Sequence, residues 1–365
     1  MEKEIDLIIP AYKAHKTIFK TLCSIAEQSC SDKIKVTIVN DCCPQGNYKK
    51  IINIFKNNLD IQEIKMPKNG GPGAARQFGI DHTELPYVIF MDADDCLMGP
   101  YAVTQLLNFL EEKEEDVAFS GFVEEFLPNQ YVMHLQDHIW FFGKIYKRDF
   151  LKKHNLIISN QRANEDTCFN KKILLLYENA EKDLPYLEAY TYAWNYKEGS
   201  ITRVNDGQYT YDQSICGYID GIIEVYNWAK KQNIRESVIR TSLYKEICFL
   251  YISYCDVGCN SEVFQEQNLE YIKKFFNLVW KEYNMDYRTQ EFIDTYEFCI
   301  ASSITDGQSS PKLFMAQPNI VQFMDMLNEL PYNENDIYEI WKRIPQKLKQ
   351  NNIDCGVCEK DYYLK

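Results

Sequence analysis

Three aspartates at the end of one apolar run are the first candidate functional residues in this chain. The segment reads YVIFMDADD, and Asp92, Asp94 and Asp95 follow its apolar residues directly. Carboxylates this close repel one another unless a cation, hydrogen-bond donors or water surround them. Their oxygens are the ligands that hard divalent cations such as Mg²⁺ and Mn²⁺ prefer. The segment therefore predicts a cation site, with an acidic turn in which Asp95 caps the following helix as the alternative.

A second acidic pair occurs later, in the segment ANEDTCF, which holds Glu165 and Asp166. Neighbouring acids disfavour each other's ionisation, which suits a general base that takes a proton from a hydroxyl group. The same two acids also stand where the pattern EDTCFNKKILLLY begins a helix, and acids at that end favour the helix dipole. The residues alone leave both interpretations open.

A glycine-rich segment, NGGPGAARQFG, precedes the three aspartates and enters a helix. It lacks the GK[ST] ending of a Walker loop. Free backbone N–H groups at such a helix start can nevertheless lie near a phosphate. Arg76 stands in the first turns of this helix, where its planar guanidinium suits paired oxygen atoms, although a surface position would also account for it.

The elements that must position these groups alternate between strand and helix. Continuous apolar runs predict strands of a parallel sheet with helices on both faces. Ligands of such sheets bind beyond the carboxyl ends of the strands. Because Tyr12, Asp41 and the three aspartates each follow a predicted strand, we expect them at one edge of the sheet. The predicted strands span 5–10, 33–41, 61–67, 86–95 and 116–126, and the predicted helices span 14–29, 48–58, 71–81 and 102–115.

The pattern changes along the rest of the chain. From residue 120 to 205 short strands and helices are mixed, and after residue 206 the apolar residues follow helical spacing. One stripe consists of Ile215, Tyr218, Ile219, Ile222 and Tyr226. We therefore expect an α/β catalytic domain over 1–205 and a mostly helical region over 206–365.

Composition narrows the classes of protein that this chain can belong to. The 365 residues are 45% hydrophobic, which is typical of a globular protein with a core. The formal net charge of -13 argues against a nucleic-acid partner. No apolar segment has the length of a signal-sequence core or a bilayer span, so we expect a cytoplasmic protein with reduced thiols. Cys255, Cys259, Cys355 and Cys358 could together bind zinc, or could be free thiols.

Taken in order, the segments resemble the family 2 inverting glycosyltransferases of the GT-A fold. The segments that carry the resemblance are IIPAYKAHKTIFKTLCSIAEQS, VTIVND, NGGPGAARQFGI, FMDADD, NEDTCF and YKEGSITR. They cover about residues 1–205. The resemblance implies a Rossmann-like, mostly parallel sheet flanked by helices, followed by a mostly helical C-terminal region for acceptor binding or oligomerisation.

The resemblance also implies the functions of particular residues. Asp166 would be the catalytic base, and Asp92 and Asp94 would hold Mn²⁺ or Mg²⁺ together with the donor diphosphate. Ser200 and Arg203 would lie on a loop that covers the donor. His134 or His138 could add a metal ligand, although packed or surface histidines would also account for them. The residues implied in nucleotide and donor binding are Pro10, Tyr12, Asp41, Asn69, Gly70, Arg76, Asp92, Ala93, Glu165 and Arg203.

The activity that the resemblance implies is metal-dependent transfer of a hexose or N-acetylhexosamine from a UDP-sugar to a hydroxyl, with inversion. A bacterial surface glycan or its precursor is the expected acceptor. Alternatives are the same chemistry on modified phage DNA or on a protein, nucleotidyl transfer with release of pyrophosphate, and a non-catalytic nucleotide-binding module. Peripheral membrane association and homo-oligomerisation are both left open.

Overall fold

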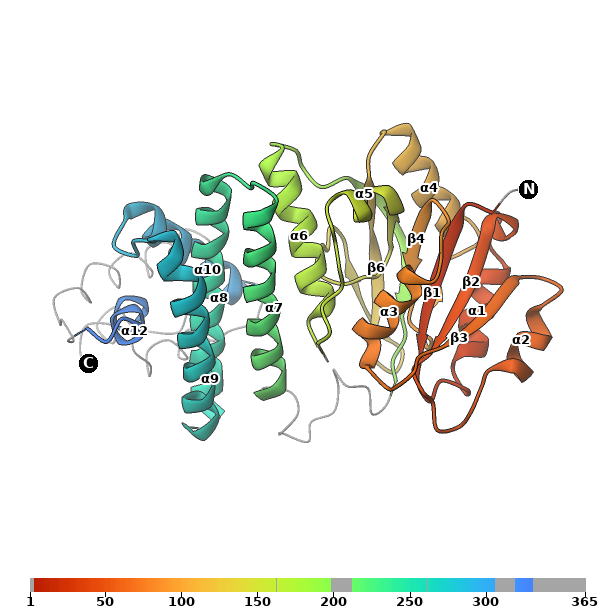
Figure 1. The fold of residues 1–365 in the computed structure, drawn as a ribbon, viewed down its shortest axis with the longest axis horizontal. Helices are drawn as coiled ribbons and strands as arrows, with labels where there is room; N and C mark the ends of the chain where they lie inside the picture. The colour runs from red at the N-terminus through yellow and green to blue at the C-terminus, as the bar shows by residue number, and fades with distance from the viewer. Residues whose placement is uncertain (1–2, 162, 198–211, 261, 306–318, 331–365) are drawn as a thin grey trace. The chain divides into compact units, whose positions relative to one another are not determined.

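The computed structural model describes residues 3–161, 163–197, 212–260, 262–305 and 319–330 (Figure 1). The chain divides into two compact units, residues 1–210 and 211–365. The first unit combines a sheet with helices, and the described part of the second unit is helical.

Four parallel strands form the first half of the sheet in the order β3-β2-β1-β4. Both faces of β1 are buried, because its residues alternate between two layers of helices. Ile5, Leu7 and Ile9 pack in one core cluster with residues of α1 and α4. Ile8 points the other way, toward Gly79 of α3. These elements are β1 (Ile5–Ala11), α1 (Ile18–Ala26), β2 (Ile34–Asn40), α2 (Lys49–Phe55), β3 (Asp60–Lys65), α3 (Gly71–Asp81), β4 (Tyr87–Phe90) and α4 (Ala102–Glu112).

The second half of the sheet is mixed. β8 is antiparallel to both β4 and β6, whereas β6 and β9 are parallel. The short strand β5, which directly follows the three aspartates, pairs with the far end of β9. These elements are β5 (Cys96–Leu97), β6 (Val117–Leu127), β7 (Gln130–His134), β8 (Lys144–Lys147), α5 (Arg148–Lys153), α6 (Glu165–Asn179) and β9 (Tyr186–Trp194).

One buried arginine joins the two halves of this sheet. The Nη2 of Arg148 donates to Asp6 at 2.8 Å, and its Nε donates to the carbonyl oxygen of Leu85 at 2.6 Å. Both Arg148 and Asp6 are buried, so each charge depends on the other. Arg148, which begins α5 directly after β8, is thereby tied to the start of β1 and to the segment that precedes β4.

The hairpin of β6 and β7 exposes apolar side chains. Tyr131 is 60% exposed and Met133 is 67% exposed. Within the described residues β7 pairs with β6 alone, so its outer edge is an edge strand.

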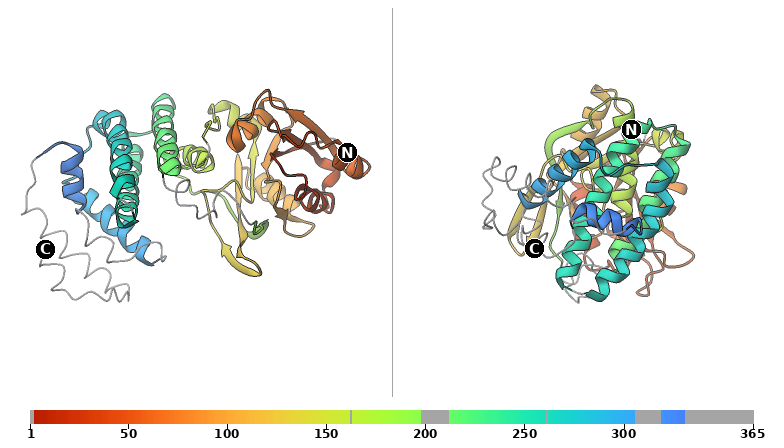
Figure 2. Two further views of the ribbon diagram at one scale, coloured as in Figure 1. Left: turned by 90° about the horizontal axis from the view of Figure 1, so that it is seen from below. Right: turned by 90° about the vertical axis from the view of Figure 1, so that its left-hand side faces the viewer.

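The second unit packs amphipathic helices around an aromatic core. The predicted stripe on α7 is confirmed, because all five of its members are buried. α9 packs against α7 and α8, and α10 packs against α8 (Figure 2). No described helix combines the length and apolar character needed to cross a bilayer. These elements are α7 (Asp212–Lys231), α8 (Glu236–Asn260), α9 (Glu262–Phe275), the π-helical turn η2 (Phe276–Trp280), the 3₁₀ turn η3 (Lys281–Tyr283), α10 (Gln290–Thr305) and α12 (Ile320–Leu327).

Candidate functional site

The site begins at Asp41, which follows β2 and is buried. Its carboxylate accepts hydrogen bonds from the backbone N–H groups of Gly70 at 2.7 Å and Gly71 at 2.9 Å. It also accepts one from Nδ2 of Asn69 at 2.9 Å. Gly71 has φ of +83°, which favours glycine at that position. Asp41 therefore holds the glycine-rich loop in the shape that starts α3.

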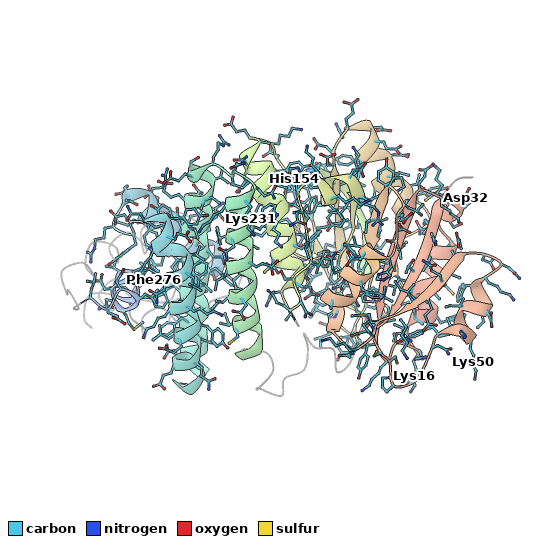
Figure 3. All side chains as sticks on the ribbon, in the orientation of Figure 1. Lys16, Asp32, Lys50, His154, Lys231 and Phe276 are labelled. Carbon is cyan, nitrogen blue, oxygen red and sulfur yellow. The ribbon has the colours of Figure 1, made fainter. Side chains whose placement is uncertain are left out.

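Tyr12 lies at the same edge of the sheet, because the backbone N–H of Asp41 donates to the carbonyl oxygen of Ala11 at 3.1 Å. Pro10 is half-buried within β1, while the ring of Tyr12 is exposed just beyond the strand. In Figure 3, Lys16 and Lys50 project at this edge of the sheet and Asp32 lies at the opposite edge. The edge thus offers an exposed aromatic ring and local cations to an anionic ligand.

Sequence reasoning missed His15, which joins the loops after β1 and β2. Its Nδ1 lies 3.0 Å from Oε1 of Gln45, and its Nε2 lies 3.1 Å from the carbonyl oxygen of Asn47. The imidazole ring stacks on Tyr48 with ring centroids 4.2 Å apart. No spacing in the sequence marks this contact, because the loops come from different strands.

Asp92 and Asp94 follow β4 and are partly exposed. Oδ1 of Asp92 lies 2.5 Å from Nη2 of Arg76, and Oδ2 of Asp94 lies 2.7 Å from Nζ of Lys197. Ala93 is buried between them. The second oxygen of each carboxylate has no hydrogen-bond partner within the part of the chain that the structure describes.

Asp95 serves a different purpose from its two neighbours. It is 1% exposed and accepts hydrogen bonds from the hydroxyl of Tyr192 at 2.6 Å and the backbone N–H of Asn195 at 2.9 Å. Burial raises the pKa of Asp95 well above its ordinary value, and Asp92 and Asp94 add to this effect. The alternative in which Asp95 caps the next helix is wrong, since Tyr101 is the N-cap of α4. Asp95 instead anchors the end of β9.

The two partly exposed carboxylates fit a divalent cation that is shared with a ligand. No group of three acidic, histidine or cysteine side chains that could hold a metal occurs among the described residues. Mg²⁺ in proteins is often held by one or two carboxylates together with substrate phosphates and water. Asp92 and Asp94 have the donor atoms for that arrangement. Nε2 of His134 instead lies 2.9 Å from Glu124, and its ring stacks on Phe122.

Arg76 links these carboxylates to the second acidic pair. Its Nη1 donates to Oε1 of Glu165 at 2.6 Å, so one guanidinium contacts both Glu165 and Asp92. Burial alone would lower the pKa of Arg76, but these two carboxylates raise it above its ordinary value. Both Nη groups contact carboxylates in the structure, so contact of Arg76 with a diphosphate stays a prediction.

Asp166, the second acid of the pair, has a strongly shifted pKa. Burial and the charge of Glu165 raise its pKa to about 7, whereas Arg76 and the backbone N–H of Thr167 act in the opposite direction. That N–H donates to Oδ1 of Asp166 at 2.8 Å. A carboxylate that titrates near neutral pH can accept a proton from a hydroxyl group.

A buried lysine supports the loop beneath Asp166, and sequence reasoning missed it. Lys144 donates to the carbonyl oxygens of Trp140 and Phe142. Burial lowers the pKa of Lys144 to about 8, and Asp137 and Asp166 act against this shift. Lys144 therefore stabilises the turn that leads into β8.

Several predicted residues lie outside the described residues. They are Ser200, Arg203, Cys355 and Cys358, and the side chain of Cys259 is likewise not described. The predictions for the donor-covering loop and for zinc therefore stay predictions.

The site lies beyond the carboxyl ends of parallel strands, where α/β proteins of this class bind their ligands. Residues 6–162 match the family model described as Glycosyl transferase family 2. The resemblance seen in the sequence is thereby confirmed over this segment.

Characterised and uncharacterised glycosyltransferases are among the similar proteins. "Glycosyltransferase GlyA" of Streptococcus pneumoniae is 24% identical over 230 residues, which are 56% of this chain and 32% of that protein. "Poly(ribitol-phosphate) beta-N-acetylglucosaminyltransferase TarS" of Staphylococcus aureus is 28% identical over 116 residues, which are 31% of this chain and 20% of that protein. The chain thus spans less than two thirds of the length of either relative.

A solved structure shows the same fold. Residues 1–349 of S. aureus TarS, in complex with UDP-GlcNAc, superpose with a TM-score of 0.62 at 17% identity. The match covers 83% of this chain and 92% of that one. The predicted fold class, a GT-A sheet followed by a helical C-terminal region, is therefore confirmed.

Proposed function

We propose that this chain is an inverting glycosyltransferase that moves a hexose or N-acetylhexosamine from a UDP-sugar to a hydroxyl acceptor. The observation that carries the proposal is the position of Asp166, which titrates near pH 7 beside Glu165, itself joined through Arg76 to Asp92. The family match over residues 6–162 supports the same activity.

The proposed donor site lies at the carboxyl edge of β1, β2 and β4. Pro10, Tyr12 and Asp41 would surround the nucleoside, and the loop of Asn69 and Gly70 would lie near the phosphates. Asp92 and Asp94 would hold Mn²⁺ or Mg²⁺ beside Ala93. A cation bound there supplies charge neutralisation to the departing UDP.

The proposed chemistry on the acceptor side requires one base. Asp166 accepts the proton of the acceptor hydroxyl as that oxygen forms a bond to the anomeric carbon. The bond from the anomeric carbon to UDP breaks, and UDP leaves with the electron pair. Attack opposite the leaving group inverts the configuration, so an α-linked donor yields a β-linked product.

We propose a bacterial surface glycan or its precursor as the acceptor. The support is the similarity to TarS, whose own name gives poly(ribitol phosphate) as its acceptor. We also propose a cytoplasmic location, which would give the chain access to a nucleotide-sugar donor. The helical unit would bind the acceptor or form an oligomer, and membrane association is proposed only as peripheral.

The test replaces Asp166 by Asn in the full chain and measures UDP release with a panel of UDP-sugars and Mn²⁺. We expect wild-type turnover with at least one donor, and a loss of about 10²- to 10⁴-fold in Asp166→Asn with donor binding retained. The exposed carboxylate variant Asp183→Asn is the control and should match the wild type.

Two results would overturn the proposal. The donor assignment fails if no UDP-sugar with Mn²⁺ changes the melting temperature of the wild type. The base assignment fails if Asp166→Asn retains turnover. Product analysis distinguishes the proposed glycosyltransferase from a nucleotidyltransferase, because a nucleotidyltransferase releases pyrophosphate instead of UDP.

A further inference from the structure

Arg76 is the one described residue whose side chain contacts both acidic clusters of the candidate site. It is 5% exposed, and its guanidinium carbon lies 4.9 Å from the centroid of the Phe141 ring. Its two Nη groups are taken up by Glu165 and Asp92, while its Nε has no hydrogen-bond partner within the described residues. The side chain is thus enclosed between an aromatic face and two carboxylates.

This enclosure argues against direct contact with a large ligand. A buried guanidinium with two carboxylate partners is already neutralised, and its unpartnered Nε is itself buried, so a phosphate could reach it only if the surrounding side chains moved. The fork of Arg76 instead sets the relative positions of α6, which carries Glu165, and the end of β4, which carries Asp92.

We propose that Arg76 is a positioning residue for the transfer reaction, which holds Glu165 against the donor-side Asp92 so that the adjacent Asp166 is placed and charged as a base. This inference rests on the proposed function of the site. It assigns Arg76 to the support of the acceptor-side base and not to the donor diphosphate.

The charges around Asp166 give the sign of the expected effect. Glu165 and Asp92 oppose its ionisation, whereas Arg76 and the backbone N–H of Thr167 favour it. The buried side chains of Lys144 and Tyr146, both on β8, also interact electrostatically with the charge of Asp166. Removing the Arg76 cation therefore raises the pKa of Asp166, since two negative neighbours are left without their counter-ion.

The test compares Arg76→Lys and Arg76→Met with the wild type in the full chain. In Arg76→Met the pH midpoint of kcat/KM should rise by about one unit, and kcat should fall about 100-fold, because both charge and position are lost. Arg76→Lys keeps the charge but not the fork, so it should return the midpoint toward the wild-type value while kcat stays about tenfold low. UDP affinity in the presence of Mn²⁺, measured by calorimetry, should change less than about threefold in Arg76→Lys.

Arg148→Lys is the matched control, because Arg148 is a buried arginine that pairs with Asp6 and contacts neither acidic cluster. It should lower the melting temperature without moving the pH midpoint. If Arg76→Met does not fold, Arg76→Lys alone tests the proposal. The loss of kcat in that variant is then compared with its loss of UDP affinity.

The proposal is overturned if Arg76→Lys weakens UDP binding tenfold or more with kcat unchanged, which is the result expected of a diphosphate contact. It is also overturned if kcat and the pH midpoint of the Arg76 variants match those of the Arg148→Lys control. A wild type that releases no UDP would instead refute the proposed function, so the two failures are distinct.

Discussion

Glu165 and Asp166 are adjacent acids whose carboxylates have different hydrogen-bond partners. Glu165 is buried and paired with a guanidinium at 2.6 Å, whereas the close donor to Asp166 is the backbone N–H of Thr167. The Glu165 carboxylate is therefore held in an ion pair, whereas burial and the charge of Glu165 raise the pKa of Asp166. Adjacent acids with such different partners can carry separate functions in a catalytic site.

The pH dependence of turnover follows from the pKa of Asp166. Its base form is the ionised one, and the pKa is raised to about 7 by burial and by Glu165. We expect kcat/KM to rise with pH, to reach half its plateau near pH 7, and to level off above pH 8. A pH series of initial rates at limiting substrate checks this. A profile already flat between pH 5 and 9 would contradict the assignment of Asp166 as the base.

At the scale of elements, α3 and α6 meet at Gly73. A Cβ added to Gly73 would lie 2.8 Å from the carbonyl oxygen of Ser159 and 3.0 Å from Cγ of Glu165. A helix can approach the acidic pair this closely only where one residue lacks a side chain. The Arg76–Glu165 ion pair therefore depends on a glycine one turn earlier in the same helix.

Gly73→Ala should disturb the site through this contact. We expect a loss of about 1–3 kcal/mol in the free energy of unfolding from overpacking, and about a tenfold loss of kcat as Glu165 moves. Denaturant melts and initial rates measure the two effects. Ala74→Gly is the control, because it weakens α3 by about 1 kcal/mol without inserting an atom at the contact. Equal kcat in the two variants would refute the link.

The Asp41 carboxylate accepts three of the hydrogen bonds that hold the loop between β3 and α3. Asp41→Ala removes the acceptor of the N–H groups of Gly70 and Gly71, and it leaves Nδ2 of Asn69 with only its second acceptor, the backbone carbonyl oxygen of residue 41. We expect a loss of about 3 kcal/mol in unfolding free energy, and weaker UDP binding because the loop loses its shape. Denaturant melts and calorimetry measure these. The exposed Asp60→Ala on β3 should stay within about 0.5 kcal/mol of the wild type, and an equal loss there would contradict the explanation.

At the scale of the whole molecule, each unit contains its own core. The buried cluster around β1 runs from Ile5 to Tyr192 and lies entirely within the first unit. We expect a fragment of residues 1–210 to unfold cooperatively and to bind UDP with Mn²⁺, while transfer to the acceptor is reduced. Thermal melts with and without UDP check the first part. A fragment that shows no cooperative transition would contradict the independence of the unit.

Local patterns predicted the parts of this fold that depend on short stretches of sequence. Gly-Gly-Pro predicted the start of α3 at residue 71, and β-branched runs predicted β1 and β2 to within one or two residues. Because ligands bind at the carboxyl ends of parallel strands, the predicted topology placed Asp41 and Asp92 together at one edge of the sheet.

Contacts between distant segments could not be predicted in this way. The sequence offers a helix cap as an alternative role for Asp95, whereas its partners in the structure are Tyr192 and Asn195, about a hundred residues later. The partner of Asp94, Lys197, was likewise missed. Such pairs are decided by the register of β5 on β9, which no local periodicity encodes.

That register has a consequence for the order in which the chain becomes active during its synthesis. The ribosome makes Asp92, Asp94 and Asp95 about a hundred residues before Tyr192 and Asn195. Until β9 emerges, Asp95 has none of these donors, and the turn after β4 lacks its second strand. We therefore expect a nascent chain to gain its nucleotide site only after the whole first unit has been translated, although most strands of the sheet exist well before then.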